Sequence, residues 1–390
     1  MQMEWKGFPM IAAQWPKTAT LFTVFGLFLC ASAQAFKPET ISVKPAIDPG
    51  SNVLVNQAEW AGASKIHVYG QQDLSYKGSV SVGLTSQILL GRDQKTLYTL
   101  SDYMKRLTRG PVESVIEEYD IATLSLKREI VIPNKAVKAI GMAQLLEQSA
   151  DGRYLYVQNA TPATSVTVVD LQAGEAVLEV PTPGCYGVFP APRDNRFSTL
   201  CGAGDLKTYS VNGDQYDTTS ISLFSPEQDP LYVQAQRTAD GRLVFLSFNG
   251  TLYLVDDGDA TAKLLGTVPL TKGVNGDWAP GGYVVMAYSP ATNMMFVLMH
   301  PDAYEGSHKD PSEEIWSVDM KSAKVIGRSH AEGLIALAVS QGQEPVLFGT
   351  TDEDETIERF ALLDNTKFVF KAAGSDDKSG WASSLLTVGE

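Results

Sequence analysis

The fold is decided by a stretch that reads Asp151-Gly-Arg-Tyr-Leu-Tyr-Val-Gln158, then Ser165-Val-Thr-Val-Val-Asp170, then Glu175-Ala-Val-Leu-Glu-Val180. An Asp-Gly turn precedes the first run of alternating apolar residues, and further turn residues separate the next two runs. Valine, tyrosine and leucine dominate all three runs, and β-branched and aromatic residues favour strands. The stretch therefore predicts three short strands joined by turns.

The same unit recurs along the chain. Two further clear copies cover Asp240–Val268 and Thr292–Gly327. Four weaker copies cover Ser51–Val82, Asp93–Pro133, Asp194–Ser222 and Glu344–Ala372. Each unit has about 50 residues, a length typical of a four-stranded propeller blade. Seven such blades can close into a ring, which leaves few exposed strand edges. The sequence predicts an all-β fold, a seven-bladed β-propeller of four-stranded blades.

Two segments are longer than a hairpin needs, Tyr103–Pro111 and His300–Pro311. Both segments are expected to connect the last two recognisable strands of their units. Equivalent connections lie on the same rim of a propeller, so we expect both inserts on one rim of the ring. Long loops on one rim are where a propeller usually binds other molecules. We expect binding residues in these two inserts.

The first 35 residues differ from the rest. Lys6 and Lys17 precede an apolar run from Thr18 to Cys30, and Ala33-Gln-Ala35 follows as a cleavage site. A transmembrane anchor, the alternative, needs about 20 apolar residues. We expect residues 1–35 to be a signal peptide and residues 36–390 to be a single exported propeller domain.

Charge and cysteines add two expectations. The formal net charge of −14 disfavours nucleic acid and anionic lipid, so neither a nucleic acid nor a membrane is an expected partner. After removal of the signal peptide two cysteines remain, Cys185 and Cys201, between apolar runs separated by turn residues. In an oxidising compartment they predict a structural disulfide across a hairpin, which we favour over a redox role because no Cys-x-x-Cys spacing is present.

A catalytic constellation does not emerge from the motifs. The histidines, His67, His300, His308 and His330, lack metal-ligand spacing, and no serine nucleophile motif is present. His300 and His308 bracket one insert, where either binding or a hydrogen-bonded structural role would fit. The acidic run Asp352–Glu355 fits a solvated turn better than a calcium loop. The motifs alone indicate no catalytic residue and no metal site in this chain.

Several long stretches resemble the heavy subunit of the tryptophan tryptophylquinone amine dehydrogenases, and the aromatic amine dehydrogenase branch more than the methylamine branch. They occur in the same order and span most of the mature chain. The matching segments are Arg106–Gly110, Leu155–Asp170, Gly184–Gly202, Trp278–Tyr283 and Met299–Lys309.

The resemblance implies a periplasmic propeller with the Cys185–Cys201 disulfide. It implies an assembly of two heavy and two light chains, in which the light chain holds the tryptophan tryptophylquinone cofactor and the catalytic aspartate. Family chemistry is the oxidative deamination of a primary amine to an aldehyde and ammonia, with electrons passed to a cupredoxin such as azurin or amicyanin.

The resemblance also assigns residues. Trp60 falls where the family places a phenylalanine of the substrate channel, although the segment from Trp60 to His67 is about two residues short, and packing at the rim is the alternative. Arg106, Arg109, His308 and Lys309 fall on matched loops, where we expect light-chain contacts or, alternatively, bracing of the loops.

Two other functions remain open. One is an orphan periplasmic propeller that acts as a binding or scaffold protein without a light chain. The other is a propeller enzyme that acts alone, such as a lactonase, which needs inward-facing carboxylates around a central metal.

Overall fold

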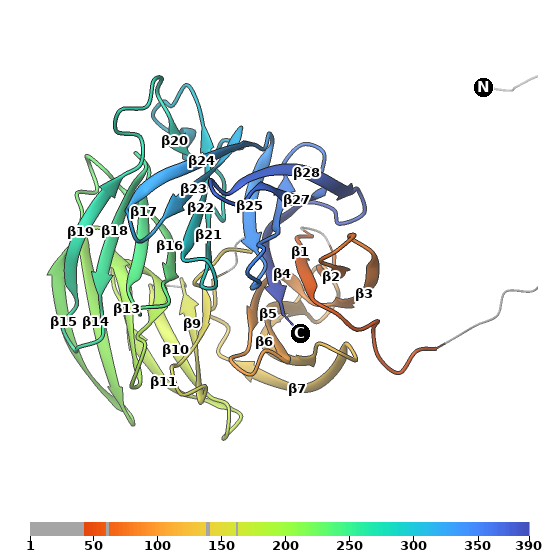
Figure 1. The fold of residues 1–390 in the computed structure, drawn as a ribbon. Helices are drawn as coiled ribbons and strands as arrows, with labels where there is room; N and C mark the ends of the chain where they lie inside the picture. Colours follow the sequence, from red (N-terminus) through yellow and green to blue (C-terminus); the bar gives the residue numbers. More distant parts are fainter. Residues whose placement is uncertain (1–42, 60–61, 138–140, 161–162, 390) are drawn as a thin grey trace, which may run out of the picture. The chain divides into compact units, whose positions relative to one another are not determined.

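Seven antiparallel sheets arranged as a ring make up nearly all of the regular structure (Figure 1). The computed structural model describes residues 43–59, 62–137, 141–160 and 163–389. Within these ranges the regular structure is strand throughout, apart from the 3-10 turn η1 (Ser307–Lys309). The predicted seven-bladed propeller of four-stranded blades is confirmed. The predicted signal peptide and Trp60 lie outside the described residues, so the statements about them stay predictions.

Blade 1 combines the two ends of the described chain. Its innermost strand is the last one, β29 (Ala382–Val388), which pairs with β1 (Asn52–Gln57). The sheet continues through β2 (Lys65–Gly70) to β3 (Tyr76–Ser81). The C-terminal strand therefore closes the ring.

The other six blades follow in chain order, each from its innermost to its outermost strand. Blade 2 contains β4 (Leu84–Leu90), β5 (Thr96–Met104), β6 (Val112–Asp120) and β7 (Ser125–Ile132). Blade 3 contains β8 (Leu146–Gln148), β9 (Tyr154–Asn159), β10 (Ser165–Asp170) and β11 (Glu175–Pro181). Blade 4 contains β12 (Cys185–Pro190), β13 (Arg196–Cys201), β14 (Asp205–Asn212) and β15 (Gln215–Ser222).

Blades 5 to 7 complete the ring. Blade 5 contains β16 (Leu231–Arg237), β17 (Leu243–Ser247), β18 (Thr251–Asp256) and β19 (Lys263–Pro269). Blade 6 has a divided inner strand, β20 (Ala279–Pro280) and β21 (Met286–Ser289), followed by β22 (Met294–His300), β23 (Glu314–Asp319) and β24 (Lys324–His330). Blade 7 contains β25 (Leu334–Val339), β26 (Leu347–Thr351), β27 (Ile357–Asp364) and β28 (Val369–Asp376).

The core lies between neighbouring blades. The second strand of blade 6, β22, is buried at every position, whereas the outer strand β11 alternates between exposed and buried residues. This difference follows from packing, because an inner strand has a blade against both faces and an outer strand has water on one side. Between blades 5 and 6 the core contains Val244, Leu246 and Trp316.

The two long inserts lie on one face of the ring, but not between the strands we expected. Residues 105–111 connect β5 to β6 and residues 301–313 connect β22 to β23. Both inserts thus join the second and third strands of four, and not the last two strands of the blade as predicted. Alternating strand directions place all such connections on one face, which we call the insert face.

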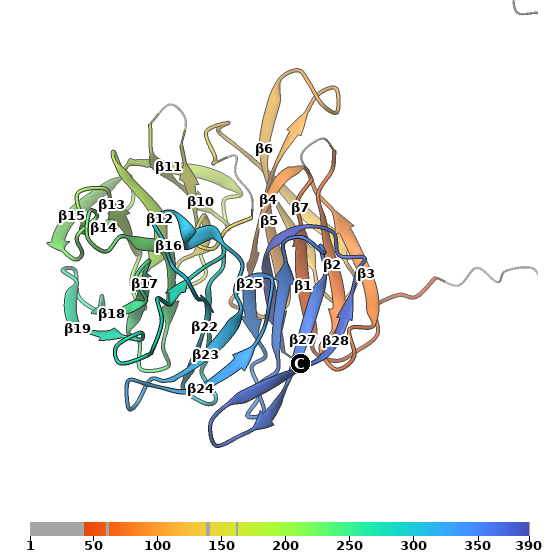
Figure 2. The same ribbon diagram turned by 90° about the horizontal axis from the view of Figure 1, so that it is seen from above.

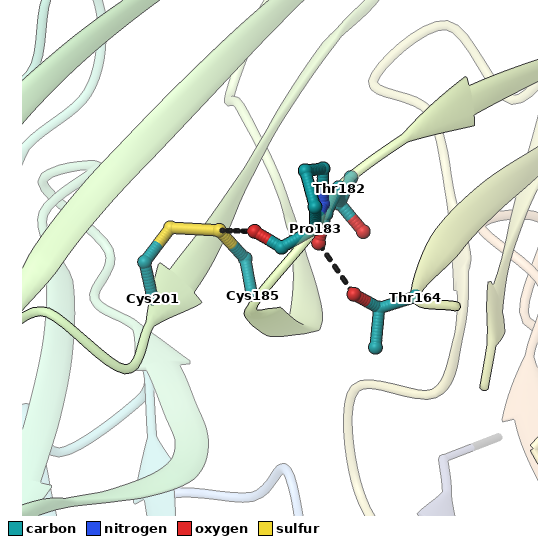
Figure 3. Close-up of a disulfide and its surroundings, with 5 residues drawn as sticks. All are labelled: Thr164, Thr182, Pro183, Cys185 and Cys201. Carbon is teal, nitrogen blue, oxygen red and sulfur yellow. Dashed lines mark hydrogen bonds between the residues drawn. A yellow bond between two sulfur atoms is a disulfide. The ribbon is translucent and has the colours of Figure 1, made fainter.

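The disulfide predicted between Cys185 and Cys201 is present, with an S–S distance of 2.07 Å (Figure 3). Cys185 begins β12, Cys201 ends β13, and the two residues are directly opposite each other in the ladder. Next to the bridge, Thr164 of blade 3 donates a 2.6 Å hydrogen bond to the carbonyl of Thr182. The disulfide therefore lies at the insert face, where blade 4 meets blade 3.

Replacing both cysteines with serine should lower the free energy of unfolding by about 3 kcal/mol, since a bridge across 16 positions restricts the unfolded chain. Urea unfolding of the two proteins measures the loss. Reducing the wild-type bridge should reproduce it, while the same treatment should leave the double variant unchanged. Equal midpoints for oxidised and reduced wild-type protein would contradict the prediction.

Candidate functional site

The insert of blade 6 places His308 against blade 5. Gly306 precedes η1 with a φ of 101°, a left-handed conformation that glycine adopts without strain. The backbone carbonyl of His308 accepts a 2.8 Å hydrogen bond from the hydroxyl of the buried Tyr232. The imidazole stacks on Phe248, with ring centroids 4.1 Å apart and an interplanar angle of 11°. His308 is thereby held as part of an aromatic surface.

The surroundings of His308 favour its neutral form. Burial lowers the pKa of His308, the charge of Lys309 lowers it further, and Asp310 opposes both effects. A neutral imidazole stacked on a phenyl ring behaves as an aromatic wall that retains one N–H donor. Lys309 itself is exposed beside it.

A pocket of about 670 Å³ opens on the insert face beside His308. Tyr304 lines this pocket with 65% of its surface exposed, and its hydroxyl forms a hydrogen bond with the carboxylate of Asp310. Glu305 is another lining residue. A large exposed aromatic side chain next to a pocket is typical of a binding surface. The remaining lining residues are Pro226, Glu227, Pro230, Phe248, Asn249, Ala279, Ala303, Gly306 and Ser307.

The insert of blade 2 is a hairpin that extends beyond the neighbouring blades (Figure 2). The Lys105 N–H donates to the Pro111 carbonyl, and the Arg106 N–H donates to the Arg109 carbonyl, both at 3.0 Å. Between the arginines, Leu107 has a φ of 59° and is 76% exposed. Both arginine side chains are exposed as well. The hairpin therefore presents two cations and one apolar side chain to solvent.

The four predicted contact residues share one face but form two separate groups. Arg106 and Arg109 belong to blade 2, while His308 and Lys309 belong to blade 6. Blades 1 and 7 lie between the two groups along one side of the ring. A partner that reaches both groups must cover a large part of the insert face.

The predicted channel residue Trp60 lies outside the described residues. Its described neighbours are well anchored: the Ala58 N–H donates to the Trp381 carbonyl at 3.0 Å, and the Glu59 N–H donates to the Ser64 hydroxyl at 3.1 Å. The buried His67 makes a 2.7 Å hydrogen bond with the side chain of Gln57. This contact agrees with a structural role for His67.

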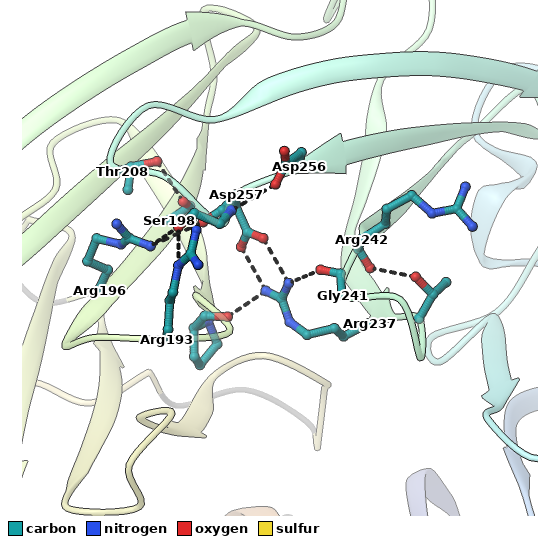
Figure 4. A network of polar contacts seen from close by, with 12 residues as sticks. Arg193, Arg196, Ser198, Thr208, Arg237, Gly241, Arg242, Asp256 and Asp257 are labelled. Carbon is teal, nitrogen blue, oxygen red and sulfur yellow. Dashed lines mark hydrogen bonds and ion pairs between the residues drawn. The ribbon is translucent and has the colours of Figure 1, made fainter.

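The opposite face contains a buried ion pair (Figure 4). Both terminal nitrogens of Arg237 bind the carboxylate of Asp257, at 2.8 and 2.7 Å, and the Asp257 side chain is 1% exposed. Arg237 also donates to the carbonyls of Gly241 and Pro190, at 2.7 and 2.6 Å. The guanidinium therefore joins blade 5 to blade 4.

Beside this pair a carboxyl group faces the central channel. Glu147 of β8 lines both the channel and a cavity at its end, together with Gln144 and Gln236. Burial raises the pKa of Glu147 to about 7, although Arg92, Arg237 and a hydrogen bond from Gln144 act in the opposite direction. Glu147 is therefore ionised in only part of the molecules at neutral pH.

Replacing Glu147 with glutamine should stabilise the protein at pH 8 by up to roughly 3 kcal/mol. The folded state holds the Glu147 proton more tightly than the unfolded state. Wild-type stability from this group is therefore complete below pH 4.5 and is lost as the pH rises through about 7. Thermal unfolding from pH 4 to 8 measures the difference, with Glu129→Gln on an exposed site as the control. Parallel curves for wild type and Glu147→Gln would contradict the prediction.

The family model for the methylamine dehydrogenase heavy chain (MADH) matches residues 52–373, which include every blade. The chain belongs to the methylamine dehydrogenase heavy chain family. The match covers the strands that form the insert face as well as both inserts. The predicted resemblance to amine dehydrogenase heavy subunits is confirmed at this level.

Two relatives in the methylamine dehydrogenase heavy chain family have low sequence identity to this chain. The methylamine dehydrogenase heavy chain of Methylophilus methylotrophus is 23% identical over 90% of this chain and 86% of its own length. That of Methylobacillus flagellatus is 25% identical over 87% of this chain and 82% of its own length. Similarity therefore extends along almost the whole propeller.

Solved structures with similar folds have lower identity. A putative 6-phosphogluconolactonase from Bacteroides fragilis aligns with a TM-score of 0.62 at 12% identity, over 90% of this chain and all of that chain. Apo AztD from Citrobacter koseri aligns with a TM-score of 0.52 at 11% identity, over 88% of this chain and 98% of that chain. At these identities the similarity concerns the fold alone.

The described ranges of this family member lack two kinds of feature. No group of three or more His, Cys, Asp or Glu side chains there could hold a metal ion. No helix in the same ranges is both long and apolar enough to cross a membrane.

Sequence reasoning named His308 but missed its aromatic partners. Phe248 precedes the Asn249-Gly250 turn, and Tyr232 is the second residue of the inner strand β16 of blade 5. Both come from a blade without an insert. An aromatic residue next to a turn on the insert side was the available signal for Phe248. Tyr232 gave no comparable signal, because a tyrosine in an inner strand resembles any core residue.

Proposed function

We propose that this chain is the large subunit of a periplasmic amine dehydrogenase that converts primary aromatic amines to aldehydes and ammonia and passes electrons to a cupredoxin such as azurin or amicyanin. The observation that carries the proposal is the family match over residues 52–373. Membership of the heavy chain family supports an amine dehydrogenase large subunit and implies a light-chain partner. The aromatic substrate, the cupredoxin acceptor and the periplasmic location are proposed in addition to what family membership supports.

The proposed assembly has two heavy and two light chains, and the cofactor is tryptophan tryptophylquinone in the light chain. When present, this group supplies the electrophile and the electron sink of the oxidation. The present chain contributes shape and surface. It covers the light chain, orients it and excludes water from the reacting amine.

The insert face is the proposed light-chain surface. Arg106 and Arg109 offer exposed guanidinium groups, which bind carboxylates through two parallel hydrogen bonds. On blade 6, His308 and Lys309 combine an aromatic wall with a cation. Trp60 is the proposed wall of the substrate channel, where a large ring would narrow the channel or stack on an aromatic amine.

The test is isolation of the tagged chain from the periplasm of its native host. The expected result is a copurifying small subunit with a visible quinone absorption band that bleaches when tyramine is added. Comparing tyramine with methylamine then tests the aromatic preference. A colourless chain without a partner would overturn the proposal and support the orphan scaffold function instead.

A further inference from the structure

The central channel and the cavity at its end on the opposite face adjoin each other and share lining residues. The channel part has a volume of about 190 Å³ and the end cavity about 260 Å³. Both are lined by Gln144, Glu147 and Gln236. Together they are large enough for a ligand of roughly ten non-hydrogen atoms. The space lies away from the insert face and is independent of the proposed light-chain surface.

The cations at the end cavity are already engaged. Arg237 uses both terminal nitrogens on Asp257 and on two carbonyls, so its charge is balanced by a buried carboxylate. Arg92 donates through Nε to the Ser149 carbonyl at 2.6 Å and through Nη2 to the Gln148 carbonyl at 3.2 Å. Arg92 is also exposed, so water screens its charge.

The groups that face the cavity are hydrogen-bond acceptors. Gln236 donates through its amide nitrogen to the Met286 carbonyl at 3.1 Å, which leaves its side-chain oxygen as the atom able to accept. Glu147 adds a carboxylate that is acceptor-only when ionised. Gln144 has its amide engaged with the backbone of Ala235 through both its nitrogen and its oxygen, and it also donates a hydrogen bond to Glu147. A ligand for this space therefore has to bring donors.

The walls beside these acceptors are apolar. Phe189, Ala235 and Leu243 line the end cavity, and Leu146, Leu337 and Leu385 line the channel. Among the described residues that line this space Glu147 is the one carboxylate, and the charge of Arg237 is balanced by Asp257. The lining therefore suits a single positive charge, whereas a divalent cation needs several carboxylates. An organic cation with a short apolar body satisfies both the acceptors and the walls.

We propose that the central channel binds a small organic ammonium ion, with its N–H groups on Glu147 and Gln236 and its apolar body against Phe189, Ala235 and Leu243. Binding requires the ionised Glu147. Arg92 from the β4–β5 turn and Arg237 from β16, with Asp257 behind it, are the other charged groups at the cavity.

The probe is N,N-dimethylbenzylammonium, a tertiary amine that is not a substrate of the proposed primary amine oxidation. Ligand-observed NMR on the isolated chain, with any partner that accompanies it, measures its affinity. We expect saturable binding that strengthens between pH 6 and pH 8. Glu147→Gln should weaken it at least tenfold at pH 8, and Gln236→Leu should weaken it several-fold.

The control is Glu129→Gln, which removes one carboxylate from an exposed position and should leave affinity unchanged. Glu147→Gln is expected to fold at least as stably as wild type, so loss of binding would not reflect unfolding. Equal affinity in wild type and Glu147→Gln, no saturable binding at pH 8, or tighter binding of benzoate than of the ammonium probe would each overturn the proposal. None of these results depends on a light chain, so the proposed function is tested separately.

Discussion

Replacing both Arg106 and Arg109 with glutamate should abolish assembly with the light chain and reduce amine oxidation to background. The two guanidinium groups lie at the tip of an exposed hairpin, and the double change reverses the charge of that tip. If each arginine is an interface anchor worth about 2 kcal/mol, their combined loss weakens binding on the order of a thousandfold. Copurification of the small subunit with the tagged variant measures the effect.

The matched control makes the same charge changes on the opposite face. Lys95 and Lys321 are exposed residues in turns of blades 2 and 6 on that face, so Lys95→Glu with Lys321→Glu should leave assembly intact. Undiminished copurification in the Arg106 and Arg109 variant would show that these arginines brace the loop or face solvent. Equal losses in both variants would point to a general effect of net charge.

Replacing Asp257 with alanine should destabilise the propeller by about 3–5 kcal/mol, the cost of leaving a buried partner charge without compensation. The Asp257 carboxylate is buried and bound through both oxygens to Arg237, which also holds the Pro190 carbonyl of blade 4. Its loss therefore weakens the contact between two blades. Urea unfolding at pH 7 measures the change.

A second aspartate of blade 5 provides the control. Asp240 pairs with Arg242 at 2.8 Å, but its side chain is 58% exposed, so Asp240→Ala should cost no more than about 1 kcal/mol. Replacing Asp257 and Arg237 together by leucine and methionine should recover much of the loss, because no unpaired charge remains. If Asp257→Ala and Asp240→Ala lower the free energy of unfolding equally, burial of the Asp257 carboxylate does not determine its contribution to stability.

The strands predicted from sequence were those with a clear pattern. Second and third strands such as β9 and β10 are buried along their length, and outer strands such as β11 alternate. The innermost strands escaped the pattern. β8 has three residues and β20 has two, and β8 includes the polar residue Glu147, which lines the channel. The two inserts share one face as predicted, but their predicted place between the last two strands was wrong, because each insert precedes the third strand of its blade and a fourth strand follows.

The candidate site was predictable only in part. The length of the inserts indicated His308 and the arginine hairpin, because a long segment between two predicted strands can be recognised in the sequence. The aromatic contact between His308 and Phe248 joins two blades, and no local pattern records such a contact. Glu147 gave no signal either, since its surroundings come from strands of several blades. Contacts between distant segments are a property of the ring and not of any one repeat.

The pairing of β29 with β1 has a consequence for how the molecule is made. Blade 1 cannot be completed until the last residues have been synthesised and, if the chain is exported as proposed, translocated. Until then β1 presents an unpaired edge that can recruit a strand from another chain. A chain clipped within its last strand would therefore be an open, self-associating molecule and not a slightly shorter propeller.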